Sequence, residues 1–457
     1  MKAKAVLAIL VGTTISLSAC GQSAQSAEMT VNEAASSESS VDLNDSATIE
    51  ESDTAKASTS DKKKSSHSGK KSEDSSESSS GTLAYSMSDG ESLSGGMYNA
   101  ENEDESVIGA GGSVTASISD ASINKTAGNA TSADSSSFEG VNAAVRVYDK
   151  ATVSLEDCTI TAEADNATGV FAYDGGTINI SDSTVNVTGG GAGGIQVAGG
   201  GTLYATNLTV TSASKAAIRS DRGGGTMVVN KGTYTSTGTG GCPAIYSTAD
   251  ITVSDASCIS ENSRAVIIEG KNSVTLENCT LSGNDQSTKE GSIKANVLLY
   301  QSASGDAQDG TSVFTMNGGS MKSNSGAMFY CTNTSSIINL NNTDLELSDS
   351  GDFLIVSAGR WGKDGSNGGN CVLGATDQLI EGNITVDDIS SLELNLDKSQ
   401  FTGEINSSGQ TGTASVTLGD DSKWILTGDS YISEFDGDID NIVTNGFHVY
   451  VDGKELV

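Results

Sequence analysis

The chain has 457 residues and a formal net charge of −34, which repels a phosphate backbone and argues against nucleic acid as a partner. Only 35% of its residues are hydrophobic and 5% aromatic, whereas glycine occurs 54 times and proline once. This supply of apolar residues is thin for a thick globular core. It suffices for short strands in which apolar and polar residues alternate, so the composition favours a stacked all-β solenoid.

Residues 1–19 have the pattern of an export signal. Two lysines give a positive start, and the apolar stretch 5–17 is too short to span a membrane as a stable helix. The sequence LSAC (17–20) resembles the lipobox of bacterial lipoproteins, in which cleavage occurs before the cysteine and its thiol carries a diacylglycerol. The resemblance implies that Cys20 is lipidated and that the chain is anchored to the extracellular face of the bacterial cell membrane. The alternative is ordinary secretion without an anchor.

Residues 20–89 are rich in Ser, Glu, Asp and Lys. Because low hydrophobicity and high charge leave too little apolar surface to bury, we expect a disordered tether. Such a tether would hold the following domain away from the membrane. The lysine clusters at 62–64 and 70–71 also fit contacts with anionic polymers or lipid headgroups, but the interspersed acids favour a solvated linker.

Residues 90–413 are expected to form the solenoid, and from Ala151 to Ser273 a pattern of short strands repeats at intervals of 23 to 25 residues, within the range of solenoid repeats. In one repeat, TINI (177–180), TVNV (184–187) and GIQV (194–197) are three alternating strands, each with two apolar residues on the same face. This pattern predicts a three-sided tube in which every strand pairs in parallel with its counterparts in neighbouring coils. Four longer excursions are expected to be outside loops, at 124–140, 284–295, 302–310 and 361–370.

Residues 414–457 carry several bulky side chains, including Trp424, Tyr431, Phe435 and Phe447. We interpret them as capping coils, because the last core layer of a solenoid must be shielded from water. The stretch resembles the terminal coils of autotransporter-type passengers.

The coils resemble those of right-handed parallel β-helix proteins of the pectate-lyase-like superfamily. SFEGVNAAV (137–145), TVSLEDCTI (152–160), SVTLENCTL (273–281) and the end 414–435 are more narrowly similar to lipid- or wall-anchored β-helix surface proteins of Gram-positive bacteria. The resemblance implies a right-handed parallel β-helix, a surface location and an adhesin-like role. A likeness of fold does not by itself assign chemistry.

All five arginines of the chain lie in or beside the third strand of a coil. Alternation sends the aliphatic residues of this strand inward, so the residues next to them point outward. Across successive coils these outward residues form a row, which we predict to continue as far as Phe329. Arginine and aromatic residues together suit the carboxylates and ring faces of an acidic glycan. We therefore predict non-catalytic adhesion or glycan binding through this face, by a monomer, to an extracellular glycan or a host or neighbouring surface. The candidate residues are Arg146, Tyr148, Phe171, Tyr173, Arg219, Arg222 and Tyr246.

The same row also fits packing under the loops that follow Asn124 and Ser302, or cross-coil stacking alone. Two other functions stay open, a polysaccharide lyase or glycoside hydrolase that acts on acidic glycans, and a passive envelope spacer. Asn342-Thr343-Asp344 matches one element of polygalacturonase-like sites, but it stands alone and turn chemistry explains it equally. We therefore assign no catalytic residue.

No cofactor or dedicated metal site is expected. The carboxylates of 436–440 are spaced like the start of a calcium loop, but its later ligands are missing, which leaves only adventitious Ca²⁺ binding. Beyond Cys20 the sequence leaves the disulfide state of six cysteines open, although stacked small residues at coil edges favour free thiols. These are Cys158, Cys242, Cys258, Cys279, Cys331 and Cys371.

Overall fold

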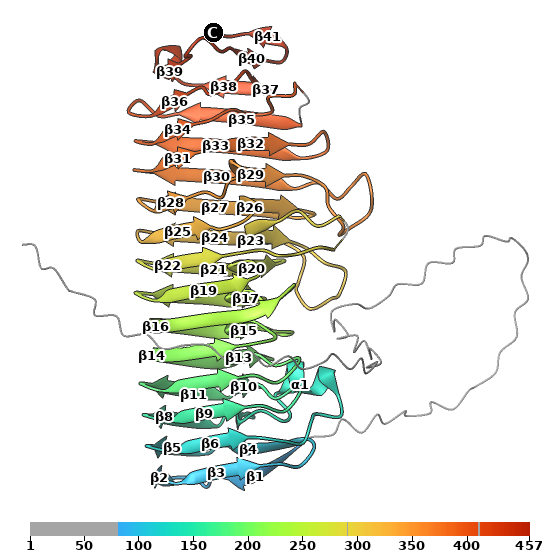
Figure 1. Ribbon diagram of the computed structural model, residues 1–457, viewed down its shortest axis with the longest axis vertical. Coiled ribbons are helices and arrows are strands. Elements are labelled where there is room, and N and C mark those ends of the chain that lie inside the picture. Colours follow the sequence, from blue (N-terminus) through green and yellow to red (C-terminus); the bar gives the residue numbers. More distant parts are fainter. Residues whose placement is uncertain (1–80, 290, 410–411) are drawn as a thin grey trace, which may run out of the picture. The chain divides into compact units, whose positions relative to one another are not determined.

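The computed structural model describes residues 81–289, 291–409 and 412–457. They form a parallel β-helix whose coils stack in chain order from β1 to the C-terminal strands (Figure 1). The predicted all-β solenoid is thereby confirmed. The predicted export signal, Cys20 and most of the predicted tether lie outside the described residues. Neither described helix is long and apolar enough to cross a membrane.

Each coil has three strand positions. Strands in the third position form a 12-stranded parallel sheet of their own. They are β1 (Thr82–Ser86), β4 (Glu105–Ala110), β7 (Val145–Val147), β10 (Val170–Tyr173), β13 (Ile195–Ala198), β15 (Ile218–Ser220), β17 (Ile245–Ser247), β20 (Val266–Glu269), β23 (Ala295–Tyr300), β26 (Ala327–Thr332), β29 (Asp352–Val356) and β32 (Asn383–Val386).

The first and second positions share a 22-stranded sheet, because two strands run through both positions without a break. Its members are β2 (Ser92–Ser94), β3 (Met97–Ala100), β5 (Thr115–Ser119), β6 (Ser122–Lys125), β8 (Thr152–Glu156), β9 (Thr159–Ala162), β11 (Thr177–Ser181), β12 (Thr184–Val187), β14 (Gly201–Ser212), β16 (Gly225–Thr239), β18 (Asp250–Ser254), β19 (Ser257–Asn262), β21 (Ser273–Glu277), β22 (Thr280–Gly283), β24 (Thr311–Asn317), β25 (Ser320–Ser323), β27 (Ser335–Asn341), β28 (Asp344–Glu346), β30 (Asn370–Thr376), β33 (Ser391–Asp397), β35 (Thr413–Leu418) and β38 (Glu434–Asp436).

Two smaller sheets complete the C-terminal coils. One holds β31 (Leu379–Glu381), β34 (Gln400–Thr402), β36 (Lys423–Ile425) and β39 (Ile442–Val443), and the other holds β37 (Ser430–Ile432), β40 (Val449–Val451) and β41 (Lys454–Glu455). The described helices are α1 (Ala133–Glu139) and the short 3₁₀ helix η1 (Ile439–Asn441).

The turn between the first and second strand positions depends on a residue with positive φ in every central coil. Asp and Asn adopt this conformation more readily than most residues because their short side chains bond to the local backbone. Asn342 has a φ of 48°, so the Asn-Thr-Asp triplet belongs to this turn. Stacked equivalents are Asp157, Asp182, Asn207, Lys231, Asp255 and Asn278.

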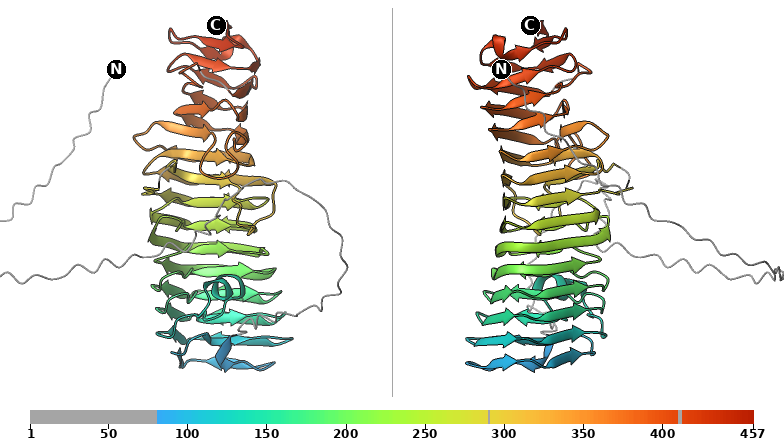
Figure 2. Two further views of the ribbon diagram at one scale, coloured as in Figure 1. Left: turned by 90° about the vertical axis from the view of Figure 1, so that its right-hand side faces the viewer. Right: turned by 60° about the vertical axis from the view of Figure 1, so that its left-hand side comes forward.

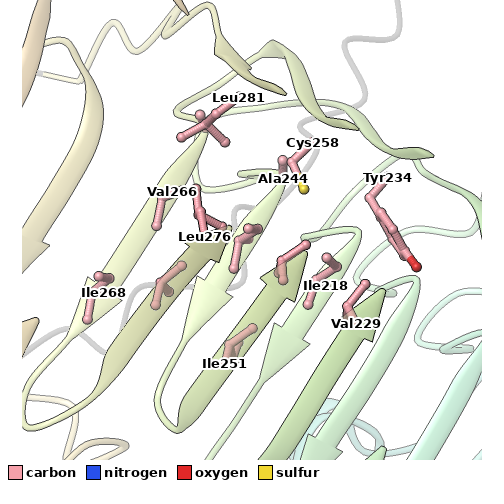
Figure 3. Packing of buried hydrophobic residues seen from close by; sticks show 14 of the residues in the cluster. Ile218, Val229, Tyr234, Ala244, Ile251, Cys258, Val266, Ile268, Leu276 and Leu281 are labelled. Carbon is pink, nitrogen blue, oxygen red and sulfur yellow. The ribbon is translucent and has the colours of Figure 1, made fainter. Parts of the chain in front are cut away.

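The interior is filled by aliphatic residues from all three positions. Val229, Ile251 and Leu276 project from β16, β18 and β21 into this interior, and all are at most 1% exposed (Figure 3). Further along, Phe329 packs against the rings of Phe314 and Phe353 with centroids 5.5 and 5.6 Å away.

The predicted outward position of Phe329 is therefore wrong. Leu298 is paired with Tyr330, which takes the outward place, whereas Phe329 is paired with Val297 in the core. The strand AMFYCT has no clear alternation, and a shift of one residue exchanges the two faces of a strand.

The solenoid starts earlier than the predicted boundary between tether and coils. β1 pairs in parallel with β4, with Leu83 beside Ser106 and Tyr85 beside Ile108. The segment that ends at residue 89 is thus not tether throughout. The alternation of apolar and polar residues in β1 is short and flanked by serines, so the composition of this stretch does not distinguish it from the tether.

At the C-terminal end, the Trp424 ring is buried, stacks on Phe401 at 5.9 Å and donates from Nε1 to the Gly403 carbonyl at 3.1 Å. The antiparallel pair β40 and β41 follows, and Tyr450 stacks on Tyr431 at 4.9 Å. Phe447 is 39% exposed and does not close the core.

Replacing Phe329 by Ala removes the middle ring of the cluster of three phenylalanines, which contact one another edge to face. We expect a loss of about 3–5 kcal/mol in the free energy of unfolding, since such a truncation leaves a cavity. Urea unfolding followed by circular dichroism measures it. Val228→Ala is the control, because Val228 is 37% exposed on the outward side of β16. Equal losses in both variants would contradict the assignment of Phe329 to the core.

Candidate functional site

The predicted binding face is the outward side of the third-position sheet, and most of it is covered by the chain itself. Arg146 and Phe171 are buried, Tyr148, Tyr173, Arg219 and Tyr246 are half-buried, and Arg222 is exposed. The left view of Figure 2 shows α1 and the longer loops on the side that carries this sheet. Of the two alternatives that the sequence left open for this face, packing under the loops describes most of its length.

Helix α1 covers the lower part of the sheet. Gln196 donates to the Ser137 carbonyl at 2.8 Å, and Nε of Arg146 donates to the Glu139 carbonyl at 2.9 Å. Gly140 ends the helix with a φ of 70°, and a Cβ there would lie 2.5 Å from the Phe171 ring. Two independent constraints therefore require glycine at position 140, namely the positive φ and the close contact with the Phe171 ring. The segment ADSSSFE has no strong helical pattern, so the sequence predicted only a loop.

Two further loops cover the upper part of the sheet. Arg264 forms a buried ion pair with Asp285 at 3.1 Å, which holds the loop 284–294. Trp361, from the loop 357–369, packs on the Tyr300 ring with the centroids 4.6 Å apart. Together these loops shield the apolar outward residues of β20, β23 and β26, namely Ile267, Leu298 and Tyr330.

The centre of the sheet carries a polar cluster around Glu269. This carboxylate is 1% exposed and accepts hydrogen bonds from the hydroxyls of Tyr246, Tyr300 and Ser302. Arg219 lies 4.4 Å above the Tyr246 ring and pairs with Asp221 at 2.8 Å. The cluster connects the sheet to the loop 301–310, because Ser302 belongs to that loop.

Burial and the nearby Glu269 carboxylate raise the pKa of Tyr246 well above its ordinary value. Burial is also the main reason that the pKa of Tyr300 is raised. Both phenols therefore remain protonated at neutral pH and act as hydrogen-bond donors to Glu269. In this state neither phenol is a base, and the cluster serves to hold the loop.

Arg222 lies where the two coverings meet. Its Nε and Nη2 donate to Asp306 of the loop 301–310 at 3.0 and 2.7 Å, and its guanidinium carbon lies 4.0 Å from the centre of the Phe138 ring of α1. About half of the side chain, 48%, stays exposed. Arg222 thus contacts both covering segments and still faces solvent.

A groove of about 420 Å³ opens beside Arg222, and we call it the Arg222 groove. Lys271 and the amide side chains of Asn272 and Gln308 also line it. Part of its floor is the run Gly223 to Gly225, where positive φ at the first two residues favours glycine and no side chain fills the space. The full lining is Arg222, Gly223, Gly224, Gly225, Thr248, Ala249, Asp250, Lys271, Asn272, Gly305, Asp306, Ala307 and Gln308.

A second groove of about 650 Å³ lies on the other side of the same loop, lined by Asp309, Asn333, Thr334 and uncharged neighbours. It is larger but holds no cationic side chain. The Arg222 groove combines two cations with two carboxylates and neutral polar groups, whereas the second groove has a carboxylate and no cation, which makes the Arg222 groove the stronger candidate site for an anionic ligand.

The sequence pattern identified Arg222 and missed its partners. Phe138 and Asp306 lie in excursions whose positions the repeat does not determine, and Lys271 lies in a turn. Alternation along β20 places Glu269 on the outward side of the sheet, but the sequence gives no sign that two tyrosines bind it. Only contacts between distant coils reveal these roles.

Among the described residues, no group of three or more His, Cys, Asp or Glu is arranged to hold a metal ion. In the acidic stretch 436–440, Asp438 accepts from the Asp440 amide at 3.0 Å and caps η1, which is a local turn contact. The structure has no disulfide bond among the six described cysteines.

No protein-family model, curated protein or solved structure matches this chain. A functional assignment therefore depends on the geometry of the site.

Lys215 connects the sheet to α1 by donating from Nζ to the Ser137 hydroxyl at 2.6 Å. Burial, reinforced by Arg219, lowers its pKa from 10.5 to about 8. Between these pH values the unfolded chain binds the proton that the folded chain has lost, so stability rises with pH.

We expect the free energy of unfolding of the wild type to rise relative to Lys215→Met between about pH 8 and 10. Denaturant titrations at several pH values measure the difference, which cancels the effect of tyrosine ionisation common to both proteins. Lys231→Met, at an exposed turn lysine, is the control. Parallel pH profiles of wild type and Lys215→Met would contradict the prediction.

Proposed function

We propose that this chain is a lipid-anchored surface protein that binds an acidic glycan in the Arg222 groove without cleaving it. The observation that carries the proposal is the meeting of Arg222 and Lys271 in one groove of a chain with a net charge of −34. Two carboxylates, Asp250 and Asp306, also line the groove, so an anionic ligand would meet less repulsion here than on the surrounding acidic surface.

The positions of the other four arginines support the choice of the Arg222 groove. Arg146, Arg219 and Arg264 contact groups under α1 and the loops, where a glycan has no access. Arg360 is exposed on the loop 357–369 and stacks on Trp361 at 4.5 Å, outside the residues that line either groove.

Asp306 orients the Arg222 guanidinium through Nε and Nη2. The Nη1 donors remain for a ligand carboxylate, and Lys271 adds a second positive charge to the lining. Asn272, Gln308 and the glycine main chain supply neutral donors and acceptors for sugar hydroxyls. This set of groups recognises a uronate better than a neutral sugar.

Binding without cleavage is favoured by the position of the acid–base groups. Glu269, Tyr246 and Tyr300 bond to one another beneath the loop 301–310. None of them lines the Arg222 groove. A general acid or base has to reach the reacting atoms within hydrogen-bond distance, and these three groups face the loop instead. Of the carboxylates that do line the groove, Asp306 accepts from Arg222 and Asp250 accepts from the Ser273 hydroxyl.

The lipobox-like end of the export signal and the charged tether complete the proposal. A lipid at Cys20 would hold the chain at the membrane, and the tether would give the Arg222 groove reach beyond it. The protein would then act in adhesion to, or retention of, an acidic polymer at the cell surface.

Isothermal titration of the intact protein with oligogalacturonate tests binding. We expect Lys271→Ala, and more strongly the double variant with Arg222→Ala, to weaken binding by about tenfold or more, because each removes a charge-assisted contact. Lys322→Ala is the matched control. This exposed lysine pairs with Glu346 on the 22-stranded sheet, and neither residue lines the Arg222 groove. Equal affinity in all variants would rule out the Arg222 groove.

The same mixtures distinguish binding from lyase or hydrolase activity. Under the proposal neither ultraviolet-absorbing unsaturated ends nor new reducing ends accumulate while oligogalacturonate stays bound. Accumulation of either kind of end would instead favour the alternative of a polysaccharide lyase or glycoside hydrolase.

The anchor is tested separately by replacing Cys20 with Ala in cells. We expect the protein to move from the membrane fraction to the soluble or secreted fraction, because the thiol that carries the lipid is lost. Cys158→Ala, which leaves the lipobox-like sequence intact, is the control. Unchanged membrane association of the Cys20 variant would contradict a lipid anchor.

A further inference from the structure

Two buried thiols meet inside the β-helix. The Sγ atoms of Cys331 on β26 and Cys371 on β30 are 3.8 Å apart, and the residues are 0% and 2% exposed. β26 occupies the third position of one coil and β30 the first position of the coil after the next, so the two side chains converge in the core from different sheets. A rotation of the thiols that shortens the separation of the sulfur atoms to a bonded distance would join these two coils.

Other cysteines of the chain make different contacts. The thiols of Cys158 and Cys279 lie 3.3 and 3.4 Å from the carbonyls of Glu156 and Glu277, at the turn that follows the first strand position. Cys279 also contacts the Val253 carbonyl at 3.4 Å. These sulfur atoms are oriented toward main-chain acceptors, whereas Cys331 and Cys371 face each other.

We propose that Cys331 and Cys371 form a disulfide when the chain folds in an oxidising compartment. A thiolate of one cysteine attacks a disulfide oxidant, such as oxidised glutathione, and releases one thiol. The other cysteine then displaces the second half of the oxidant from the mixed disulfide. Two cysteine thiols become one disulfide, and the oxidant accepts the two electrons and two protons as two thiols. Because both sulfur atoms are shielded in the folded chain, the exchange takes place before these coils close.

The bond would secure the base of the loop 357–369. The Ser357 amide donates to the Cys331 carbonyl at 3.1 Å, so the loop leaves β29 beside Cys331. It returns through Gly369, where a Cβ would lie 2.6 Å from the same carbonyl oxygen. The loop carries Trp361, which covers Tyr300. A disulfide between Cys331 and Cys371 therefore links the coils from which this cover emerges.

Peptide mapping without reduction tests the proposal on the intact chain. The protein is refolded with a mixture of oxidised and reduced glutathione, and its remaining thiols are alkylated after unfolding. Trypsin cleaves after Arg360 and Lys363, between the two cysteines, and yields peptides 323–360 and 364–398 with one cysteine each. We expect these two peptides to be joined, with the mass of a single disulfide, and to separate on reduction.

Cys331→Ser should abolish the cross-link, whereas Cys258→Ser should retain it. A link between peptides 232–264 and 272–289 in its place would assign the bridge to other cysteines and overturn the proposal. Complete alkylation of Cys331 and Cys371 after oxidative refolding would overturn it as well. Circular dichroism of the refolded wild type ensures that the map reports on the folded chain. The test uses no glycan and no membrane, so its outcome is independent of the proposed function.

Discussion

The structure depends on the parallel main-chain ladder between coils. A single coil cannot pair its own N–H and C=O groups, so each coil is satisfied only by those above and below it. The register passes from coil to coil without a shift through most of the solenoid, as in the row Val153, Ile178, Leu203 and Met227. Once the register is set, equivalent residues of successive coils lie above one another. Each row of side chains then points either into the core or toward the surface along many coils.

The same stacking explains the composition. Inward rows accept aliphatic residues of modest size, so few aromatic residues are needed until Phe314, Phe329 and Phe353 meet in the core. The turns demand a residue with positive φ in each coil, which explains many of the regularly spaced Asp and Asn residues. Several acidic residues of the chain therefore serve the turns, and Asn342 of the Asn-Thr-Asp triplet is a turn residue of the same kind.

The outward rows of the third-position sheet show how a solenoid acquires a local site. Apolar and arginine side chains in these rows would be exposed on a bare sheet, and the excursions of individual coils cover them. Arg222 is the exception, because it bridges Phe138 and Asp306 at the border between two coverings and remains half exposed. The Arg222 groove thus arises where the coverings end, and its charge comes from residues that different coils supply.

The sequence by itself determined the fold class, the repeat length and the alternation that separates core from surface, because these properties are local and recur in every coil. It also singled out the rows that carry arginine. Only the tertiary structure decided that Arg146 and Phe171 lie under α1, that Phe329 faces the core and that Lys271 joins Arg222 in one groove. Excursions such as 126–144 and 301–310 interrupt the repeat, so their docking depends on contacts between residues far apart in the chain. Alternation also leaves register undecided where both neighbours are apolar, and there packing against the next coil makes the choice.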